Sequence, residues 1–455
     1  MLLSPPTGWA QDPLRLDLAA VVARALEASP ALGVARARRA EIEGSVTEVA
    51  ADAWPQVDFV AGWSRSRDPS FLVSADFDDI VELFPGFEPE EQEAWTTGVE
   101  LRQTLYSGGK VRAAVELAEI AVEVADERLA ETRLDVAMTA AEAFYELAAA
   151  ERSVAILDAE RAARDAALEV VEARLEIGEA TRLEQLRALA ARDEVAPRLA
   201  EAEGRIEIAR VRLRAALALE PDAPVALEAP IVGRDDGPTV DTLAVETLGV
   251  EDVVSSAPPL DVLRAEARRG RPALRDLALQ IAAIERERTV EAAEGKPQVD
   301  FTGAYGRRGR TLDQLPDALY DEWRVGAGVT WSLFDGGRRR GLLAQIDARG
   351  EALRWRLEEL EREIDADLAT RRAAHQAARE RLRASAVAAT AAREAVRVAD
   401  ASYRQGVALQ ADLLDARERS TRAELAVDDA LFDALRAGAR LRRAVGLLPT
   451  EEWSQ

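Results

Sequence analysis

The sequence predicts an α+β membrane protein that is mostly helical and internally duplicated, with four membrane-crossing β-strands. Three observations carry this prediction. Charged residues make up 31% of the 455 residues while aromatic residues make up only 5%, a balance typical of long helices with charged surfaces. Short motifs recur at constant offsets along the chain. Four segments alternate apolar and polar residues with a period of two, the period of a strand with two different faces.

Composition excludes several classes of function. The net charge of -24 argues against a nucleic-acid partner, because binding a polyanion requires clustered cations. The chain has no cysteine, so it has no disulfide, thiolate metal site or lipid-modified cysteine. No apolar run reaches the length of about 18 residues that a transmembrane helix needs.

The sequence also indicates no enzymatic site. The single histidine, His375, lies among Arg, Ala and Glu in a helical run. We expect it on a helix surface, because most histidine-based sites need a partner ligand; no metal site and no cofactor are predicted. The segment Gly108-Gly109-Lys110 lacks the upstream glycine spacing and the following Ser or Thr of a phosphate-binding loop. We therefore expect no catalytic residues.

The chain repeats one pattern twice. At an offset of 242 residues, SPAL at 29–32 matches RPAL at 271–274, and PQVDF at 55–59 recurs at 297–301. A second set of matches has an offset of 228 residues: Trp95 with Trp323, 105–110 with 333–338, Gly178 with Gly406, and Pro221 with Pro449. The difference between the offsets falls in one loop after residue 67. A repeat of this length is too long for a solenoid unit and indicates two similar halves.

The sequence pattern predicts the same order of elements in each half: a helix, two strands, a long helix and a further helix. The first half, 11–221, predicts helices at about 30–53, 109–177 and 180–219 and strands at about 55–67 and 94–106. The second half, 271–449, predicts helices at about 271–294, 337–405 and 408–446 and strands at about 297–310 and 322–334. Glycine and proline mark the helix ends, and Pro197 is expected to kink its helix.

The remaining segments are shorter. Residues 1–10 resemble the end of a signal peptide cleaved after Ala10, with a disordered tail as the alternative. Residues 222–270 predict a linker with a short helix that forms a collar, and 450–455 form a tail. At 1.5 Å per residue, each long helix would extend roughly 100 Å, far beyond the diameter of a globular domain.

Tryptophan placement favours a membrane for the four strands. Alternation alone is a weak signal, because any half-buried antiparallel sheet shows it. Five of the eight tryptophans lie in or beside the strands, as an interfacial aromatic girdle requires: Trp54, Trp63, Trp95, Trp323 and Trp331. The polar faces carry charges and many glycines, which suits a water-filled lumen.

The number of strands predicts an oligomer. Four strands cannot close a membrane barrel, and open strand edges in lipid would leave backbone groups without hydrogen bonds. If the strands span a membrane, several chains must therefore share one barrel.

Two kinds of motif carry a family resemblance. The strand-to-helix junctions read LYSGGK at 105–110 and LFDGGR at 333–338, and the segment 403–416 reads YRQGVALQADLLDA. With the duplicated order of elements, these resemble the TolC family of outer-membrane efflux proteins over essentially residues 15–450. The resemblance implies a homotrimer with a shared 12-strand barrel in the outer membrane and an α-helical coiled-coil barrel through the periplasm. It also implies passive conduction, with a periplasmic adaptor protein and an inner-membrane pump of RND or ABC type as partners.

The resemblance also assigns site residues. It places helix-reversal turns with adaptor contacts at Gly178 and Gly406, and strand–helix junctions at Gly108, Gly109, Gly336 and Gly337. It implies a periplasmic gate made of Glu184, Tyr403, Asp412 and Asp415. Asp412 and Asp415 are three residues apart and share one helix face, so an oligomer would stack them as carboxylate rings. The alternative is that these acids serve as ordinary helix-start residues favoured by the helix dipole.

One position departs from the family pattern. Two residues after the second turn glycine, the best-known member has a latch arginine, whereas this chain has Ala408. Arg182 and Arg404 are the candidate substitutes.

Other readings stay open. The outer-membrane component of type I protein secretion is the alternative within the family, and small-molecule efflux is favoured on family frequency. A soluble coiled-coil scaffold is the alternative from another class, and it leaves the alternating strands without a purpose.

Overall fold

The computed structural model describes residues 14–67, 91–228 and 257–451. The predicted signal-peptide remnant, most of the loop after residue 67, the middle of the linker and residues 452–455 lie outside the described part. By their contacts the residues divide into two compact units. The helical unit comprises 1–38, 126–276 and 357–455, and the sheet unit comprises 39–125 and 277–356. Each unit therefore contains parts of both sequence repeats.

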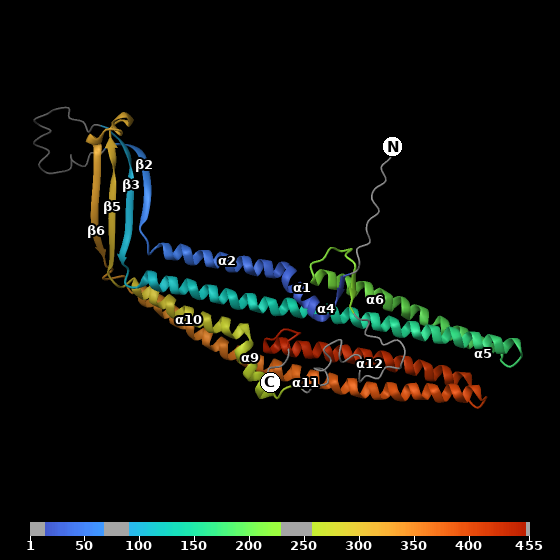
Figure 1. Ribbon diagram of the computed structural model, residues 1–455. Helices are drawn as coiled ribbons and strands as arrows, with labels where there is room; N and C mark the ends of the chain where they lie inside the picture. The colour runs from blue at the N-terminus through green and yellow to red at the C-terminus, as the bar shows by residue number, and fades with distance from the viewer. Residues whose placement is uncertain (1–13, 68–90, 229–256, 452–455) are drawn as a thin grey trace, which may run out of the picture. The chain divides into compact units, whose positions relative to one another are not determined.

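The sheet unit holds one antiparallel four-stranded sheet (Figure 1). Its strands are β2 (Gln56–Ser66), β3 (Gln92–Tyr106), β5 (Gln298–Gly309) and β6 (Asp321–Thr330). They lie in the order β2-β3-β5-β6, so that β2 and β6 form the two edges. Proline precedes β2 and β5 at the same repeat position, Pro55 and Pro297, where its missing N–H ends the ladder.

The fourth strand is shorter than the sequence predicts. Its predicted range of 322–334 ends instead at Thr330, because Thr330 pairs with Gln298, the first residue of β5. Residues 331–334 extend beyond that neighbour and have no strand opposite them within the described chain.

The two faces of the sheet differ as the alternation predicts. Large apolar side chains gather on one face and are exposed: Val57, Phe59, Trp63, Val99, Tyr305, Trp323, Val325 and Val329. On the other face Arg102 donates to Asp58 at 2.5 Å, and the Thr104 hydroxyl donates to Asp300 at 2.9 Å. A bulge between Thr104 and Tyr106 shifts the register of β3 against β5.

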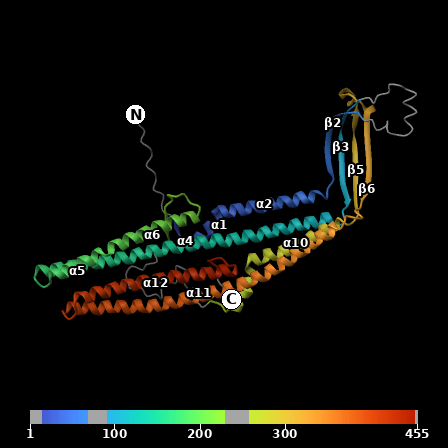
Figure 2. The same cartoon turned by 180° about the vertical axis from the view of Figure 1, so that it is seen from behind.

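Long helices connect the sheet to the rest of the chain. These are α4 (Lys110–Glu176) and α11 (Arg338–Arg404), which are the same length, and α2 (Pro30–Ala51) and α10 (Pro272–Ala293), which also match. Figures 1 and 2 show α10 beside α11. Within the sheet unit, ion pairs join α10 to both long helices: Arg286–Glu116 at 3.1 Å, Arg288–Asp347 at 2.8 Å and Arg349–Glu287 at 2.9 Å.

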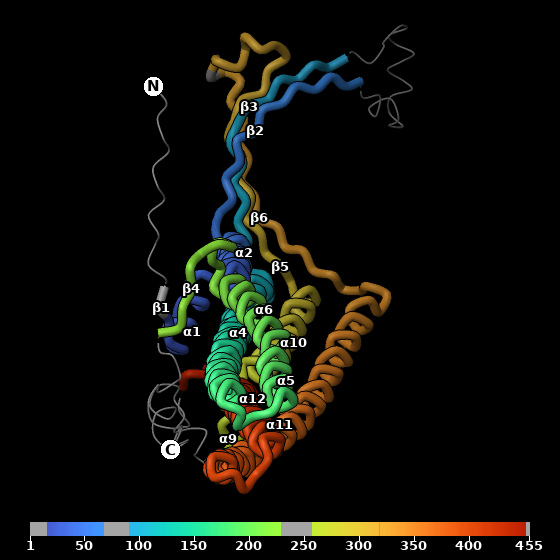
Figure 3. Tube along the Cα trace, turned by 90° about the vertical axis from the view of Figure 1, so that its right-hand side faces the viewer, coloured from blue at the N-terminus to red at the C-terminus, as the bar shows by residue number. Residues whose placement is uncertain are grey.

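The helical unit packs α5 (Arg182–Asp193), α6 (Val195–Ala216) and α12 (Gln410–Val445) with the remainder of α4 and α11. Figure 3 shows α5 and α6 alongside α4, and α12 beside α11. Its core is built largely from alanine and leucine with a few large side chains, among them Ala137, Ala141, Phe144, Leu213, Phe432 and Leu435. Small residues let helices approach closely, which compensates for the low aromatic content.

A break separates α5 from α6 where the sequence predicts a kinked single helix. The break lies at Glu194, three residues before Pro197. Pro197 has no N–H to donate to the carbonyl of Asp193, and its ring crowds that carbonyl. In the second repeat the equivalent residue is Leu425, and α12 is continuous there.

Two short helices lie directly before α2 and α10. They are α1 (Leu18–Ala28) and α9 (Leu260–Gly270), which are related by the offset of 242 residues. The second falls within the linker 222–270, where a short helix is predicted, whereas the first is not predicted. Each buries the same two positions, Val21 and Ala25 in α1 and Leu263 and Ala267 in α9. Two short strands, β1 (Leu14–Leu16) before α1 and β4 (Val225–Leu227) after α6, pair in parallel.

No single helix of the described residues is long and apolar enough to cross a membrane. The helices α1 and α2, which are bent by 44° relative to each other, meet the length and composition criteria only as a pair.

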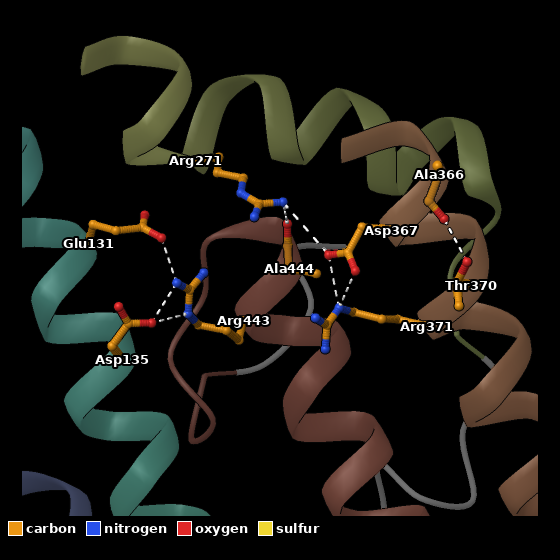
Figure 4. Close-up of polar contacts among 9 residues, drawn as sticks. All are labelled: Glu131, Asp135, Arg271, Ala366, Asp367, Thr370, Arg371, Arg443 and Ala444. Atoms are coloured by element: carbon orange, nitrogen blue, oxygen red, sulfur yellow. Dashed lines mark hydrogen bonds and ion pairs between the residues drawn. The ribbon is translucent and has the colours of Figure 1, made fainter. Parts of the chain in front are cut away.

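Arginines join α12 to its neighbours in the helical unit (Figure 4). Arg443 pairs with Glu131 at 2.5 Å and with Asp135 at 2.6 Å on α4. Arg271 donates to the Ala444 carbonyl at 3.4 Å. Further along the same α4–α12 seam, Arg440 pairs with Glu142 at 2.7 Å and Arg152 with the buried Asp428 at 2.6 Å. At the corresponding offset, Arg443 maps onto Ala215, so the first repeat lacks this arginine.

The last helix of each repeat ends in the left-handed region. Gly446 has φ of 100° and Ala218, its equivalent, has φ of 51°. Both ends close alike: Leu447 donates to the Arg442 carbonyl at 3.0 Å, and Leu219 donates to the Arg214 carbonyl at 2.9 Å. Ala218 is the one non-glycine residue with positive φ in the described part of the chain.

Replacing Ala218 with glycine is expected to stabilise the protein. A non-glycine residue costs about 1–2 kcal/mol in this conformation, so Ala218→Gly should raise the melting temperature by about 1–2 °C for a chain of this size. The matched change Gly446→Ala should lower it, because the added Cβ would lie 2.6 Å from the Gly270 carbonyl oxygen. Differential scanning calorimetry in detergent measures both, and a lower melting temperature for Ala218→Gly contradicts this account.

Candidate functional site at the helix-reversal turns

Two tight turns lie at one end of the helical unit (Figures 1 and 3). The first joins α4 to α5 and the second joins α11 to α12. Gly178 has φ of 81° and Gly406 has φ of 74°, a conformation that glycine adopts without steric cost. Glu179 donates to the Arg174 carbonyl at 2.8 Å, and Val407 donates to the Ser402 carbonyl at 3.0 Å. The two turns are therefore structural copies.

Two of the predicted gate acids cap the helices that follow these turns. Glu184 accepts hydrogen bonds from the Thr181 backbone N–H at 2.6 Å and from the Thr181 hydroxyl at 2.9 Å. These bonds hold the pKa of Glu184 below its usual range. Asp412, its equivalent, accepts from the Leu409 N–H at 3.1 Å. Both carboxylates thus satisfy an N–H group that the helix itself leaves unpaired.

Asp415 lies one turn further along α12 and has a different partner. It pairs with Arg419 at 2.7 Å, and its side chain is about half exposed. Asp412 and Asp415 share a helix face but make no bond to each other in this chain.

Tyr403 connects the two hairpins. The Arg174 guanidinium lies over its ring, 5.4 Å from the centroid. Within the described residues its buried hydroxyl has no hydrogen-bond partner. Because Arg174 belongs to α4 and Tyr403 to α11, this cation–π contact holds the ends of the two long helices together.

Sequence reasoning missed a second connection, made by Gln410. This first residue of α12 is buried, and its amide donates to the Glu184 carbonyl of α5 at 3.0 Å. The equivalent of Gln410 in the first repeat is Arg182, a different residue type, so comparing the two repeats does not indicate a role for Gln410. A polar residue beside a turn glycine is unremarkable in a sequence, and only the fold shows that it is buried.

The two candidate substitutes for the latch arginine act within their own helices. Arg182 contacts Gln185, and Arg404 pairs with Asp400 at 2.7 Å. Asp400 also lies 3.5 Å from Arg417 of α12. Arg182 and Arg404 therefore make contacts within single helices, whereas Arg174 and Gln410 connect the two hairpins.

Apolar side chains are exposed around both turns. Val407 is 80% exposed and Leu409 71% exposed. Ile177 and Leu183 are exposed beside the first turn. A cluster of exposed apolar residues at a helix end is typical of a contact surface for another protein.

The strand–helix junctions are also copies of each other. Gly108 and Gly336 both have φ of 65°, and Gly109 and Gly337 both have φ of 92°. At the first junction Lys296 donates to the Gly108 carbonyl at 2.8 Å, and a Cβ on Gly108 would lie 2.8 Å from the Lys296 side chain. Glycine is required here by both conformation and space.

The predicted tryptophans fall near both ends of the sheet. Trp63 and Trp95 face each other across β2 and β3 with ring centroids 6.3 Å apart, and Trp323 faces Tyr305. Trp54 precedes β2, and Trp331 follows β6 and donates to the Gly295 carbonyl at 3.0 Å. Three tryptophans thus lie toward the loop end of the sheet and two toward the helix end.

The prediction that His375 lies on a helix surface is wrong. The residue is buried between α11 and α12. Its side chain is 2% exposed, and its ring lies 3.6 Å from the position of a Cβ on Gly438. Burial, with a smaller effect of Arg379, lowers the pKa of His375 to about 4. Gly438 makes room for the imidazole. The charged residues that surround His375 along the chain gave no sign of this burial.

Among the described residues, no group of three or more acidic or histidine side chains is placed to hold a metal ion.

Comparison with known families decides the class of protein. A family model described as outer membrane efflux protein matches residues 21–219 and 263–447. The chain belongs to this outer membrane efflux protein family. The two matched segments begin at positions related by 242 and end at positions related by 228, the offsets of the internal duplication.

Relatives and solved structures agree with this family. The outer membrane protein TolC of Vibrio cholerae is 23% identical over 452 residues, covering 98% of this chain and 92% of that one. The structure of VceC from Vibrio cholerae is 21% identical with a TM-score of 0.73, covering 94% of this chain and 96% of that one. The open-state structure of the MtrE channel of Neisseria gonorrhoeae is 20% identical with a TM-score of 0.74, covering 94% and 89%.

Family membership settles the coarse function. The chain is an efflux channel protein of the outer membrane that extends into the periplasm. This family consists of channels and not of enzymes, so the prediction of a non-enzymatic protein is confirmed. The predicted fold class, a mostly helical, duplicated chain with a small sheet, is confirmed as well.

Proposed function

We propose that three copies of this chain form the outer-membrane exit duct of a tripartite export system. In this arrangement three four-stranded sheets make one barrel of twelve strands, and the long helices make a tunnel below it. The duct conducts its cargo passively, and the energy comes from an inner-membrane pump. The observation that carries the proposal is the four-stranded sheet, which is apolar and exposed on one face and whose two edges have no partner strand in the described part of the chain.

The two faces of the sheet suit lipid on one side and water on the other. Exposed Phe59, Trp323 and Val329 would be unfavourable in water but favourable against acyl chains. The opposite face carries the Arg102–Asp58 pair and five glycines, Gly62, Gly98, Gly306, Gly326 and Gly328. A face lined by small and charged residues leaves room for a wet lumen. This pattern also argues against the soluble scaffold.

The family supports the proposed number of copies. Among the described residues, strands β2 and β6 each have one neighbour, and an unpaired backbone group in hydrocarbon costs several kcal/mol. Further copies of the chain remove both edges. Proteins of the TolC family are generally homotrimers that work with an adaptor and a pump, and three copies of four strands give the proposed barrel.

The apolar surface at the turns is the proposed adaptor contact. Val407 and Leu409 are exposed at the second turn, while their equivalents in the first repeat are Glu179 and Thr181. A periplasmic adaptor with an apolar tip would bury Val407 and Leu409. An inner-membrane pump of RND or ABC type would be connected through that adaptor. Small-molecule efflux is the proposed transport class.

Polar substitution of this surface tests the tripartite function. In a strain that lacks its own duct, the chain with its cognate adaptor and pump should restore extrusion of a fluorescent pump substrate. Val407→Glu/Leu409→Thr, which copies the first-repeat residues, should lower extrusion to the level of the empty strain while insertion into the outer membrane stays normal. Val407→Ile/Leu409→Met is the matched control. Extrusion that persists in the polar variant, or that needs no adaptor, sinks the proposal.

We also propose that the turns form the periplasmic entrance. Three copies would bring Asp412 and Asp415 into two rings of carboxylates, a trap for cations and a barrier to anions. Tyr403, Glu184 and Gln410 hold the hairpins that present these rings.

Charge removal at the entrance should reduce cation preference. Asp412→Asn/Asp415→Asn keeps a side-chain acceptor for the Leu409 N–H but removes both charges. In planar bilayers under a KCl gradient, its reversal potential should move toward zero relative to the native protein. Glu380→Gln, which loses an exposed pair with Arg383 on α11, is the control and should leave the potential unchanged. An equal reversal potential for the native and double-variant channels would count against the rings.

A further inference from the structure

The two β-hairpins are copies of each other residue by residue. The offset of 242 carries β2 onto β5, and the offset of 228 carries β3 onto β6. Under these offsets Val57 opposite Leu101 becomes Val299 opposite Val329, and Trp63 opposite Trp95 becomes Tyr305 opposite Trp323. All pairs between β5 and β6 are images of pairs between β2 and β3. The duplication therefore preserves strand register and not only sequence.

The pairing of β3 with β5 joins these two copies. Under the same offsets β3 corresponds to β6 and β5 corresponds to β2. The equivalent, or image, of the β3–β5 pairing is therefore a pairing of β6 with β2. Within one chain β6 and β2 are opposite edges of the sheet, so this image pairing needs a second copy of the chain. The register of the second contact can be read from the first.

We propose that β6 of one copy pairs antiparallel with β2 of the next copy, with Val329 opposite Ala61 and Ala327 opposite Trp63. These pairs are the images of Leu101 opposite Gly303 and of Val99 opposite Tyr305. The inference rests on the proposed shared barrel and adds the register of its contact between chains.

The short end of β6 supports this partner. Residues 331–334 have no neighbour on β5, yet their equivalents in β3, 103–106, are paired through a bulge with Phe301, Asp300 and Val299. The images of those partners are Phe59, Asp58 and Val57 of β2. A second copy in the proposed register would extend β6 to residue 334, which is the strand end that the sequence predicts.

Side-chain chemistry is preserved across the proposed contact. In β3–β5, the Thr104 hydroxyl donates to the Asp300 carboxylate at 2.9 Å. The image pair is Ser332 and Asp58 of the next copy, again a hydroxyl and a carboxylate. On the apolar face the register brings Val329 and Ala327 against Ala61 and Trp63, so both faces continue from one copy to the next. A slip by one residue would turn the apolar side chains of β6 into the lumen.

The two seams differ in the space available at one glycine pair. Gly98 and Gly306 approach closely in β3–β5, where a Cβ on Gly98 would lie 2.7 Å from the Tyr305 carbonyl oxygen. Their images are Gly326 and Ser64. The seam between copies must therefore shift locally to admit the Ser64 side chain, and we expect it to be the looser of the two.

Cysteine pairs test the register directly, because the chain has no cysteine of its own. Ala61→Cys/Val329→Cys, oxidised in outer membranes with copper phenanthroline, should give covalent dimers and trimers on a non-reducing denaturing gel, and reduction should return monomers. Leu101→Cys/Gly303→Cys is the matched control at the seam within one chain and should link without raising the mass. Phe59→Cys/Val329→Cys and Trp63→Cys/Val329→Cys place the pair two residues out of register on the same face and should link at least several-fold less.

The outcomes separate the register from the function. More linkage in either out-of-register variant, or equal linkage in all three, overturns the proposed register. Native mass spectrometry of the unoxidised protein reports the oligomer independently. Trimers without the Ala61–Val329 link leave the duct standing and refute the register, whereas monomers refute both.

Discussion

The constraint on which this structure depends is the pair of open edges on a four-stranded sheet. A strand edge exposes a row of N–H and C=O groups, and lipid offers them no partner. The four strands that the structure describes are too few to curl this sheet closed, and its apolar face is too exposed to remain in water. Both problems have one solution, which is to share the barrel with further copies. In the proposed shared barrel the single chain is one part of a larger fold.

Internal duplication makes that solution geometrically simple. Two hairpins in the same register, joined through β3 and β5, already form a short stretch of repeating barrel. The helical unit is duplicated less strictly. The seam between α4 and α12 carries Arg443, Arg440 and Arg152 in ion pairs, while the equivalent of Arg443 is Ala215. The helices of the two repeats thus differ chemically while the sheet remains nearly symmetric.

Much of this architecture could be predicted from the sequence. The helix and strand periods, with glycine and proline at their ends, indicated α4, α11 and all four membrane strands, because these elements depend on local pattern. The short helix α1 was not predicted, since it buries only Val21, Val22 and Ala25 and lies beside a proline, whereas a short helix was expected in the linker that holds α9. The burial of His375 and Gln410 also could not be inferred, because it depends on Gly438 and Glu184 across a helix interface. Asp412 was predicted as a gate residue, and in the single chain its visible role is to cap a helix.

The most direct test of the central claim is the number of chains and strands in the intact particle. Single-particle cryo-electron microscopy of the protein in lipid nanodiscs measures both. This account predicts three chains around one axis and a closed barrel of twelve strands in which every β6 lies beside the β2 of another copy. A particle with another number of chains, or a sheet whose edges are covered by its own chain, would contradict it.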